Sequence, residues 1–181
     1  MAKYAVIVVD MLDDFVNGAL ACERCKEIVP ALAALCDAAR AKNVPVIFSN
    51  DAHIKGVDKE LKLWGDHALA GTPGANVTSE LHADTARDFI LPKRHYSGFF
   101  GTDLNLLLKD LGVDTCIITG VHTHICCVHT AADAYQYGYD VVLPDDTTTA
   151  FTENDYINGM KYIKEMYGAR ICKSSEVAAE F

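Results

Sequence analysis

Three residues that could act together in catalysis follow apolar, strand-like runs of the sequence. Asp10 closes the first run, Lys93 follows the third, and Cys126 follows the fourth at the start of a helical pattern. A thiol at a helix N-terminus is stabilised as thiolate by free backbone amides, and a nearby ammonium group adds to this effect. A carboxylate close to both could accept the thiol proton and return it to a leaving amine. These residue types predict nucleophilic catalysis by Cys126.

Each residue also has an ordinary explanation when it is taken alone. A strand-end Asp often caps a turn, a Lys that follows a proline is usually solvated, and a buried Cys acts as a small hydrophobic residue. The catalytic interpretation therefore depends on whether the fold brings Asp10, Lys93 and Cys126 together. In open parallel sheets, ligands bind outside the carboxyl ends of the strands, which is where these residues stand in the sequence.

The elements that must position these residues alternate between β-rich apolar runs and helical patterns. Four of the runs are nearly continuously apolar, as expected when helices cover both faces of a parallel sheet. The pattern predicts a doubly wound α/β protein with three layers, α/β/α, in one domain over residues 1–181. The predicted strands are residues 4–9, 45–49, 88–91, 115–119, 140–143 and 169–172. The predicted helices are residues 25–42, 102–111, 125–137 and 153–167. Residues 51–87 exceed an ordinary connection, and loops of that length are usually functional or disordered.

The overall composition excludes several classes of partner. A formal net charge of −9 disfavours nucleic acid and anionic membranes, because both require clustered Lys and Arg. No apolar stretch approaches the roughly 18 residues needed to span a bilayer, and the N-terminal run is too short for a secretory signal. Seven cysteines, an odd number, do not resemble a secreted disulfide framework. We expect a cytoplasmic protein with reduced thiols.

Three separated motifs carry a resemblance to a known family. The segment GVHTHICCVHTAADA, residues 120–134, resembles the nucleophile motif of isochorismatase-like hydrolases, with Cys126 as the nucleophile. The acidic motif of that family is matched by VVDMLDDF, which contains Asp10, and its lysine motif by KRHYSGFFGTDL, which contains Lys93. The resemblance covers nearly the whole chain and implies a six-stranded parallel sheet between helices. It also implies a catalytic triad of Asp10, Lys93 and Cys126 that acts through a thioester.

The same resemblance implies an oxyanion hole and a metal site. The backbone N–H groups of His122 and Cys126 would form the oxyanion hole, after a cis peptide bond between Val121 and His122. Within the family, nicotinamidases carry a metal site, and Asp51, His53 and His67 match three of its ligands, with Glu60 at the position of the fourth. The carboxylate and imidazole of Asp51 and His53 point the same way if this segment is extended. Zn²⁺ is the first expectation, although Mn²⁺ and Fe²⁺ tolerate the same ligands.

The substrate expectation follows from this resemblance. A pyridine nitrogen could complete the coordination of the metal and fix a carboxamide over Cys126. Phe15, Trp64 and Tyr96 match aromatic positions around the substrate in nicotinamidases, although each could be plain core. We therefore expect an amidohydrolase that converts nicotinamide to nicotinate and ammonia, in a homo-oligomer. The alternatives are an amidase acting on another small carboxamide or carbamoyl compound, an isochorismatase-type hydrolase, a non-catalytic interaction module, and a thiol redox protein.

Some residues depart from the family pattern or are not explained by it. Leu12 stands where many members have Gln, and Cys127 replaces the usual Val after the nucleophile. Successive helix residues diverge by about 100°, so only one of the two adjacent thiols can face the site. The pair Cys22 and Cys25 could be half a zinc site or a redox dithiol, but the only other close Cys pair is the adjacent one at the proposed active site, so we interpret both as ordinary residues.

Overall fold

The protein is built on a parallel sheet whose strand order reverses beside β1. In the computed structural model, which describes residues 3–181, the order is β3-β2-β1-β4-β5-β7, and a short strand β6 pairs with β4 outside this order. All of these pairs are parallel. The strands are β1 (Tyr4–Val9), β2 (Val46–Asp51), β3 (Phe89–Lys93), β4 (Thr115–Val121), β5 (Asp140–Pro144), β6 (Thr148–Thr149) and β7 (Arg170–Cys172). The six predicted strands are confirmed to within two residues at either end, and β6 was not predicted.

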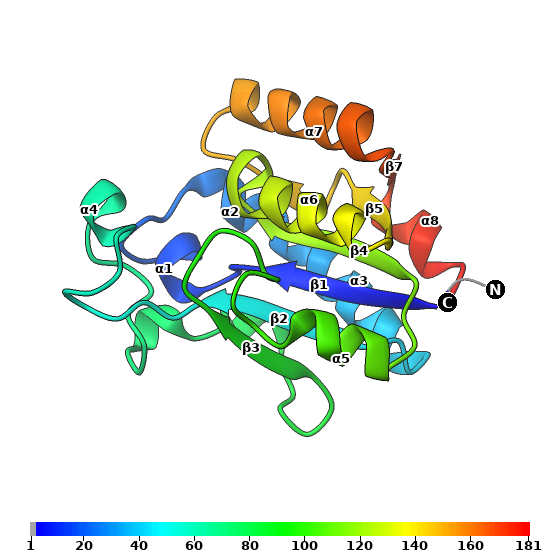
Figure 1. The fold of residues 1–181 in the computed structure, drawn as a ribbon, viewed down its shortest axis with the longest axis horizontal. Helices are drawn as coiled ribbons and strands as arrows, with labels where there is room; N and C mark the ends of the chain where they lie inside the picture. The colour runs from blue at the N-terminus through cyan, green and yellow to red at the C-terminus, as the bar shows by residue number, and fades with distance from the viewer. Residues whose placement is uncertain (1–2) are drawn as a thin grey trace.

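Helices cover both faces of the sheet, as the continuous apolar strands predict. One face carries α3 (Val29–Ala41) and α8 (Ser174–Ala178), and the other carries α5 (Leu104–Asp110) and α6 (Val128–Gln136), with α7 (Glu153–Tyr167) against α6. Figure 1 shows α3 behind the sheet and α5 and α6 in front of it. The predicted three-layer α/β architecture is confirmed.

Alternation of side chains along β1 divides the core into two parts. Val6 and Val8 pack in the cluster that includes α3, whereas Ile7 and Val9 pack in the cluster on the side of α5 and α6. All four side chains are fully buried. Burial of this kind stabilises by about 1.5 to 3 kcal/mol per large aliphatic side chain, so the central strands form a rigid base for the residues that follow them.

Two predicted helices differ from the structure near their N-termini. The predicted helix 25–42 is two helices, α2 (Glu23–Glu27) and α3, which meet at Ile28. Pro30 explains the break, because proline fits the first turn of a helix but removes a hydrogen bond and clashes in its interior. The predicted helix 125–137 begins with a π-helical turn, η3 (Thr123–Cys127), and continues as α6.

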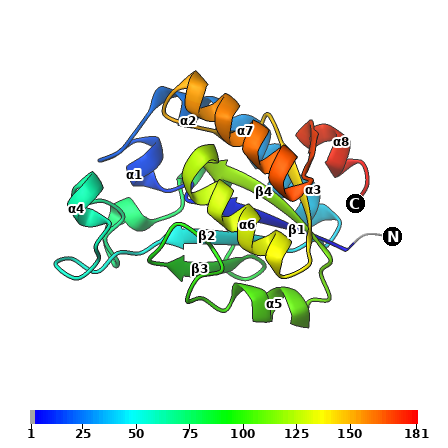
Figure 2. The ribbon, with the colours of Figure 1, turned by 45° about the horizontal axis from the view of Figure 1, so that its top comes forward.

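The remaining elements gather at one end of the molecule. The long connection predicted as residues 51–87 contains α4 (Leu61–Trp64) and two 3₁₀ turns, η1 (Pro73–Ala75) and η2 (Ser79–Leu81). Together with α1 (Asp13–Val16), α4 lies at the end toward which β1 points, while the described ends of the chain lie at the opposite end (Figures 1 and 2). Side chains that follow the strands therefore meet under this connection.

Candidate active site

Asp10, Lys93 and Cys126 come together at the carboxyl edge of the sheet. The Nζ atom of Lys93 lies 2.8 Å from Oδ2 of Asp10 and 3.9 Å from Sγ of Cys126. One carboxylate oxygen of Asp10 also lies within 4.8 Å of the Cys126 sulfur. The strand order explains the meeting, because β1 and β4 are neighbours and β3 lies two strands away on the other side of β1. The structure thus brings the three predicted residues together.

The local backbone aims Asp10 into this group. Asp10 has a φ of 52°, in the left-handed region that Asp adopts more readily than most residues. Its Oδ1 atom accepts a hydrogen bond of 2.7 Å from the backbone N–H of Asp51 at the end of β2. The carboxylate is therefore held by the neighbouring strand as well as by Lys93.

Lys93 is a buried cation between two buried carboxylates. Its side chain is fully covered, and its Nζ atom lies 2.5 Å from Oδ1 of Asp51 in addition to the contact with Asp10. Although burial opposes the charge, Asp10 and Asp51 hold the pKa of Lys93 well above its usual value. Lys93 is accordingly a fixed positive charge, not a proton donor.

The electrostatics around Cys126 differ from the expectation of a stabilised thiolate. Cys126 lies in the π turn and not at the first residue of an α-helix, and it is 5% exposed. Burial holds the pKa of the Cys126 thiol well above its usual value, although Lys93 opposes this effect. Burial and the Asp51 carboxylate raise the pKa of Asp10 to about 6. The resting pair is a neutral thiol beside a carboxylate of increased basicity, which suits proton transfer during the attack on a substrate.

The approach to Cys126 has an unusual backbone. Gly120 has a φ of 91°, and a Cβ atom there would lie 2.0 Å from the carbonyl oxygen of Val9, so only glycine allows β4 to lie this close to β1. The peptide bond between Val121 and His122 is cis, as predicted. Within residues 3–181, no backbone carbonyl accepts a hydrogen bond from the His122 N–H.

The four residues predicted as metal ligands also come together. Asp51, His53, Glu60 and His67 each offer a ligand atom, and these atoms all lie within 4.8 Å of one another. Asp51 ends β2 and His53 follows it two residues later, whereas Glu60 and His67 flank α4. The long connection thus folds back over the strand ends to complete the group.

Two hydrogen bonds orient the imidazoles of this group. Nδ1 of His53 lies 3.1 Å from Oδ2 of Asp58, and Nδ1 of His67 lies 2.8 Å from the carbonyl oxygen of Gly65. Both contacts leave Nε2 as the atom that faces the group, which is the usual arrangement of metal-binding histidines. Asp58, which also pairs with Arg94, was missed by the sequence analysis. A carboxylate five residues after His53 carries no motif of its own.

The chemistry of the group fits a divalent cation. Oδ2 of Asp51 and Nε2 of His53 are buried and have no hydrogen-bond partner within the described chain. Burial and the nearby Asp51 carboxylate raise the pKa of Glu60 to about 7, so the carboxylates repel one another without a cation. Two imidazoles and two carboxylates suit Zn²⁺, Mn²⁺ or Fe²⁺.

A small cavity joins the two groups. It is lined by Phe15, Leu20, Asp51, Glu60, Trp64, His67, Tyr96, His122, Ile125, Cys126 and Phe151. The three predicted aromatic residues therefore all face it, and Nε1 of Trp64 donates a hydrogen bond of 3.2 Å to the hydroxyl of Tyr96. Phe151, which no motif indicated, stacks on the rings of His122 and Trp64. The cavity is walled by flat rings and open to both Cys126 and the metal-ligand group.

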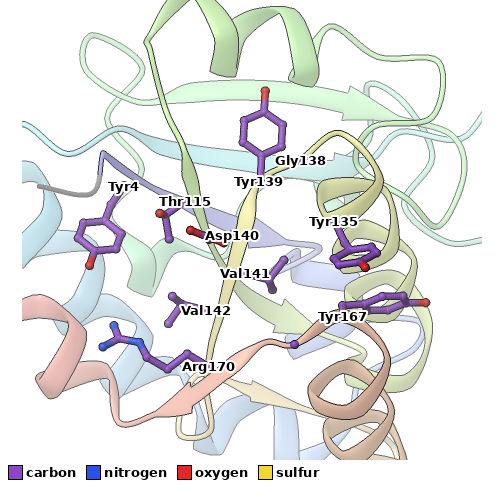
Figure 3. A pocket seen from close by; sticks show the side chains of 11 residues that line it. Tyr4, Thr115, Tyr135, Gly138, Tyr139, Asp140, Val141, Val142, Tyr167 and Arg170 are labelled. Carbon is purple, nitrogen blue, oxygen red and sulfur yellow. The ribbon is translucent and has the colours of Figure 1, made fainter.

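A larger cavity lies away from these groups. Its lining includes Tyr4, Thr115 and Asp140, the first residues of β1, β4 and β5, and it is therefore at the amino ends of the strands (Figure 3). Around it, tyrosines and one arginine surround strand backbone, with neither a cysteine nor a histidine in the lining. Of these two cavities, only the smaller one is lined by a cysteine and histidines.

The fold and the grouped side chains define an α/β protein of the hydrolase class. The chain belongs to the isochorismatase family, because the Isochorismatase domain model matches residues 4–176. No helix within residues 3–181 has both the length and the apolar character to cross a bilayer.

Three relatives illustrate the range of the family. Nicotinamidase 3 of Arabidopsis thaliana is 33% identical over 82% of this chain and 74% of its own length. N-carbamoylsarcosine amidase from Thermoplasma acidophilum is 34% identical, with a TM-score of 0.89 over 95% of this chain and 96% of that one. The pyrazinamidase of Pyrococcus horikoshii, solved in complex with zinc, is 29% identical with a TM-score of 0.86, over 94% and 99%.

Proposed function

We propose that the protein is a metal-dependent amidase that hydrolyses nicotinamide to nicotinate and ammonia, with Cys126 as the nucleophile. The observation that carries the proposal is the small aromatic cavity with Cys126 on one side and the metal-ligand group on the other. A flat heteroaromatic carboxamide fits between Phe15, Trp64 and Tyr96, with its ring nitrogen toward the metal-ligand group and its carboxamide toward the thiol.

Proton transfer in this proposal depends on Asp10. As the Cys126 sulfur attacks the carboxamide carbon, the thiol proton passes to Asp10, because burial raises the pKa of this carboxyl and makes it a better proton acceptor than an exposed Asp. Asp10 then gives this proton to the leaving amine, and ammonia departs from a thioester. Water, deprotonated by Asp10, hydrolyses the thioester and releases the acid, and Asp10 returns that proton to the departing Cys126 sulfur.

Charge that develops on the carbonyl oxygen would be stabilised by backbone N–H groups. The N–H of His122, which donates to no backbone carbonyl within residues 3–181, and the N–H of Cys126 form the proposed oxyanion hole. Lys93 keeps its positive charge beside Asp10 throughout and offsets the negative charge of the two carboxylates that flank it. Its role in this proposal is to balance the charge of Asp10 and Asp51 and to keep both carboxylates in position.

Asp51, His53, Glu60 and His67 would hold the divalent cation, which would supply a coordination position for the ring nitrogen. This position also distinguishes substrates, because a carbamoyl compound without such a nitrogen gains nothing from it. The similarity to N-carbamoylsarcosine amidase keeps an N-carbamoyl amino acid as the second candidate substrate. An isochorismate-type vinyl ether is the third.

The test is ammonia release by zinc-reconstituted protein from nicotinamide, with an N-carbamoyl amino acid assayed beside it. We expect release from nicotinamide that falls by roughly 10⁶-fold in Cys126→Ala and is lost on chelation and restored by zinc. Cys127→Val is the matched control, since the Cys127 sulfur points to the carbonyl of Thr119 and lines no part of the cavity. Faster release from the carbamoyl compound, or turnover that survives chelation, would reject the nicotinamide proposal.

A further inference from the structure

A second group of potential metal ligands lies next to the active-site cavity. Cys22 and Cys25, which the sequence analysis took as ordinary residues, meet His122 in the folded chain. One ligand atom from each of the three lies within 4.8 Å of the others. The two sulfurs are 2.7 Å apart, closer than neutral thiols in van der Waals contact. We refer to these residues as the Cys22–Cys25–His122 cluster.

The imidazole of His122 is the strongest indication of a ligand. His122 is 4% exposed, and neither of its ring nitrogens has a hydrogen-bond partner within residues 3–181. A buried polar group without a partner costs about 1 to 3 kcal/mol, so such groups are rare in folded proteins. Phe151 stacks on one face of the ring and Phe15 meets it edge-on, and neither can accept or donate a conventional hydrogen bond. The ring is held in place with its nitrogens unused.

The two cysteines are placed against His122 by a fixed element. Cys22 is the N-cap of α2 and Cys25 lies within it. Arg24, between them, donates to Thr149 in β6 and pairs with Glu153 at the start of α7 at 2.7 Å. This helix is therefore held near His122 by contacts that do not involve either sulfur.

We propose that Cys22, Cys25 and His122 bind one thiophilic divalent metal ion, separate from the ion of the Asp51 group. Two thiolates and one imidazole form a ligand set for Zn²⁺ or Co²⁺ that leaves a fourth position open to an exchangeable ligand. Binding converts two thiols to thiolates and releases two protons, with no change of oxidation state. Since the ligands come from a short helix and a loop beside the cavity, the ion lies at the wall of the active site, where it holds the His122 ring.

Metal binding accounts for the unpartnered His122 imidazole, which pairing of the two cysteines alone does not. A disulfide between Cys22 and Cys25 would explain the short distance between the sulfurs but would leave the His122 nitrogens unpartnered. In a tetrahedral site with Zn–S bonds of about 2.3 Å, the two sulfurs are separated by about 3.8 Å. Binding therefore requires the two sulfurs to move apart, and Cys22, half-buried at the N-cap of α2, is the residue placed to move.

The experiment is Co²⁺ titration of fully reduced Cys126→Ala protein under anaerobic conditions, followed by absorbance. Thiolate-to-cobalt charge transfer in the near ultraviolet reports only sulfur ligands. The Asp51 group contains no sulfur, and Cys126→Ala removes the thiol of the catalytic residues next to it. We expect two Co²⁺ ions per chain and a charge-transfer band. The additional changes Cys22→Ser and Cys25→Ser should abolish the band and leave one ion. The changes His53→Ala and His67→Ala should leave one ion and keep the band.

The proposal is overturned if the reduced Cys126→Ala protein shows no charge-transfer band, or if the band persists in the doubly serine-substituted protein. Cys22→Ser alone, at a half-buried position, guards against loss of the fold and should remove about half of the band intensity. The readout is absorbance and stoichiometry, so the result does not depend on whether nicotinamide is the substrate. A pair that only forms a disulfide on air oxidation, without cobalt uptake after reduction, also contradicts the proposal.

Discussion

Replacement of Asp58 is expected to weaken metal binding although Asp58 is not among the proposed ligands. Its Oδ2 atom contacts Nδ1 of His53 at 3.1 Å and accepts the backbone N–H of Ile54 at 2.9 Å. The hydrogen bond with Arg94 holds the pKa of Asp58 well below its usual value, so Asp58 is an anion at any working pH. An anionic partner fixes the tautomer and orientation of His53 and increases the basicity of Nε2.

The magnitude follows from what each substitution leaves behind. Loss of such a partner typically weakens metal binding by about 10- to 100-fold, or about 1.4 to 2.7 kcal/mol. In Asp58→Asn, the side-chain oxygen can still accept from Nδ1 of His53, but the charge is gone, so we expect a decrease of about tenfold. In Asp58→Ala, both the charge and the acceptor are lost, so we expect about 100-fold.

Zinc affinity would be measured by competition with a chromophoric chelator, and the fold by circular dichroism. Asp110→Asn is the matched control, since Asp110 is exposed at the end of α5, remote from the site. At saturating zinc, Asp58→Asn should recover most of its amidase activity. Equal zinc affinity in the parent, Asp58→Asn and Asp58→Ala would contradict this role of Asp58, because His53 would then need no anionic partner.

Three further outcomes follow from the buried contacts. Lys93→Met should lower the free energy of unfolding by about 3 to 5 kcal/mol in urea titrations, because it leaves two buried carboxylates without their cation. A loss below 1 kcal/mol would argue against the buried ion pairs of Lys93 with Asp10 and Asp51. Phe151→Ala should raise KM for nicotinamide more than it lowers kcat, because it removes the ring stacked on His122 at the cavity wall; an unchanged KM would exclude Phe151 from binding. Gly120→Ala should prevent folding at 37 °C, since its Cβ would clash with the carbonyl of Val9. Protein yield and circular dichroism would measure this loss. A soluble, active variant would contradict the close approach of β4 to β1.

The strands were predictable from the sequence because each is a short local pattern of residues. Continuous apolar runs such as residues 4–9 and 115–119 are typical of strands buried on both faces, and the residue after each run points to the ligand-binding edge. The gathering of Asp10, Lys93 and Cys126 then follows from the parallel arrangement. Family resemblance added the metal ligands, whose separation along the chain gives no periodic signal.

Other features depend on tertiary contacts that no short pattern encodes. Phe151 reaches the cavity from a loop after β6, and Cys25 lies near His122 in an element, α2, that Arg24 ties to β6 and α7. The expectation of a stabilised thiolate failed for a similar reason. It considered the helix end and Lys93 but not the depth of burial, which raises the pKa of Cys126.

Asp51 connects the two halves of the proposed mechanism. Its Oδ1 atom accepts from Lys93, its backbone N–H donates to Asp10, and its Oδ2 atom belongs to the metal-ligand group. A cation bound at Oδ2 would withdraw electron density from Asp51 and weaken its hold on Lys93, which would pair more closely with Asp10 and lower the pKa of that carboxyl. Loss of metal is therefore expected to disturb the acid and base as well as substrate binding. In kinetic terms, metal depletion should lower kcat in addition to raising KM, whereas an ion that only bound the pyridine nitrogen would affect KM alone.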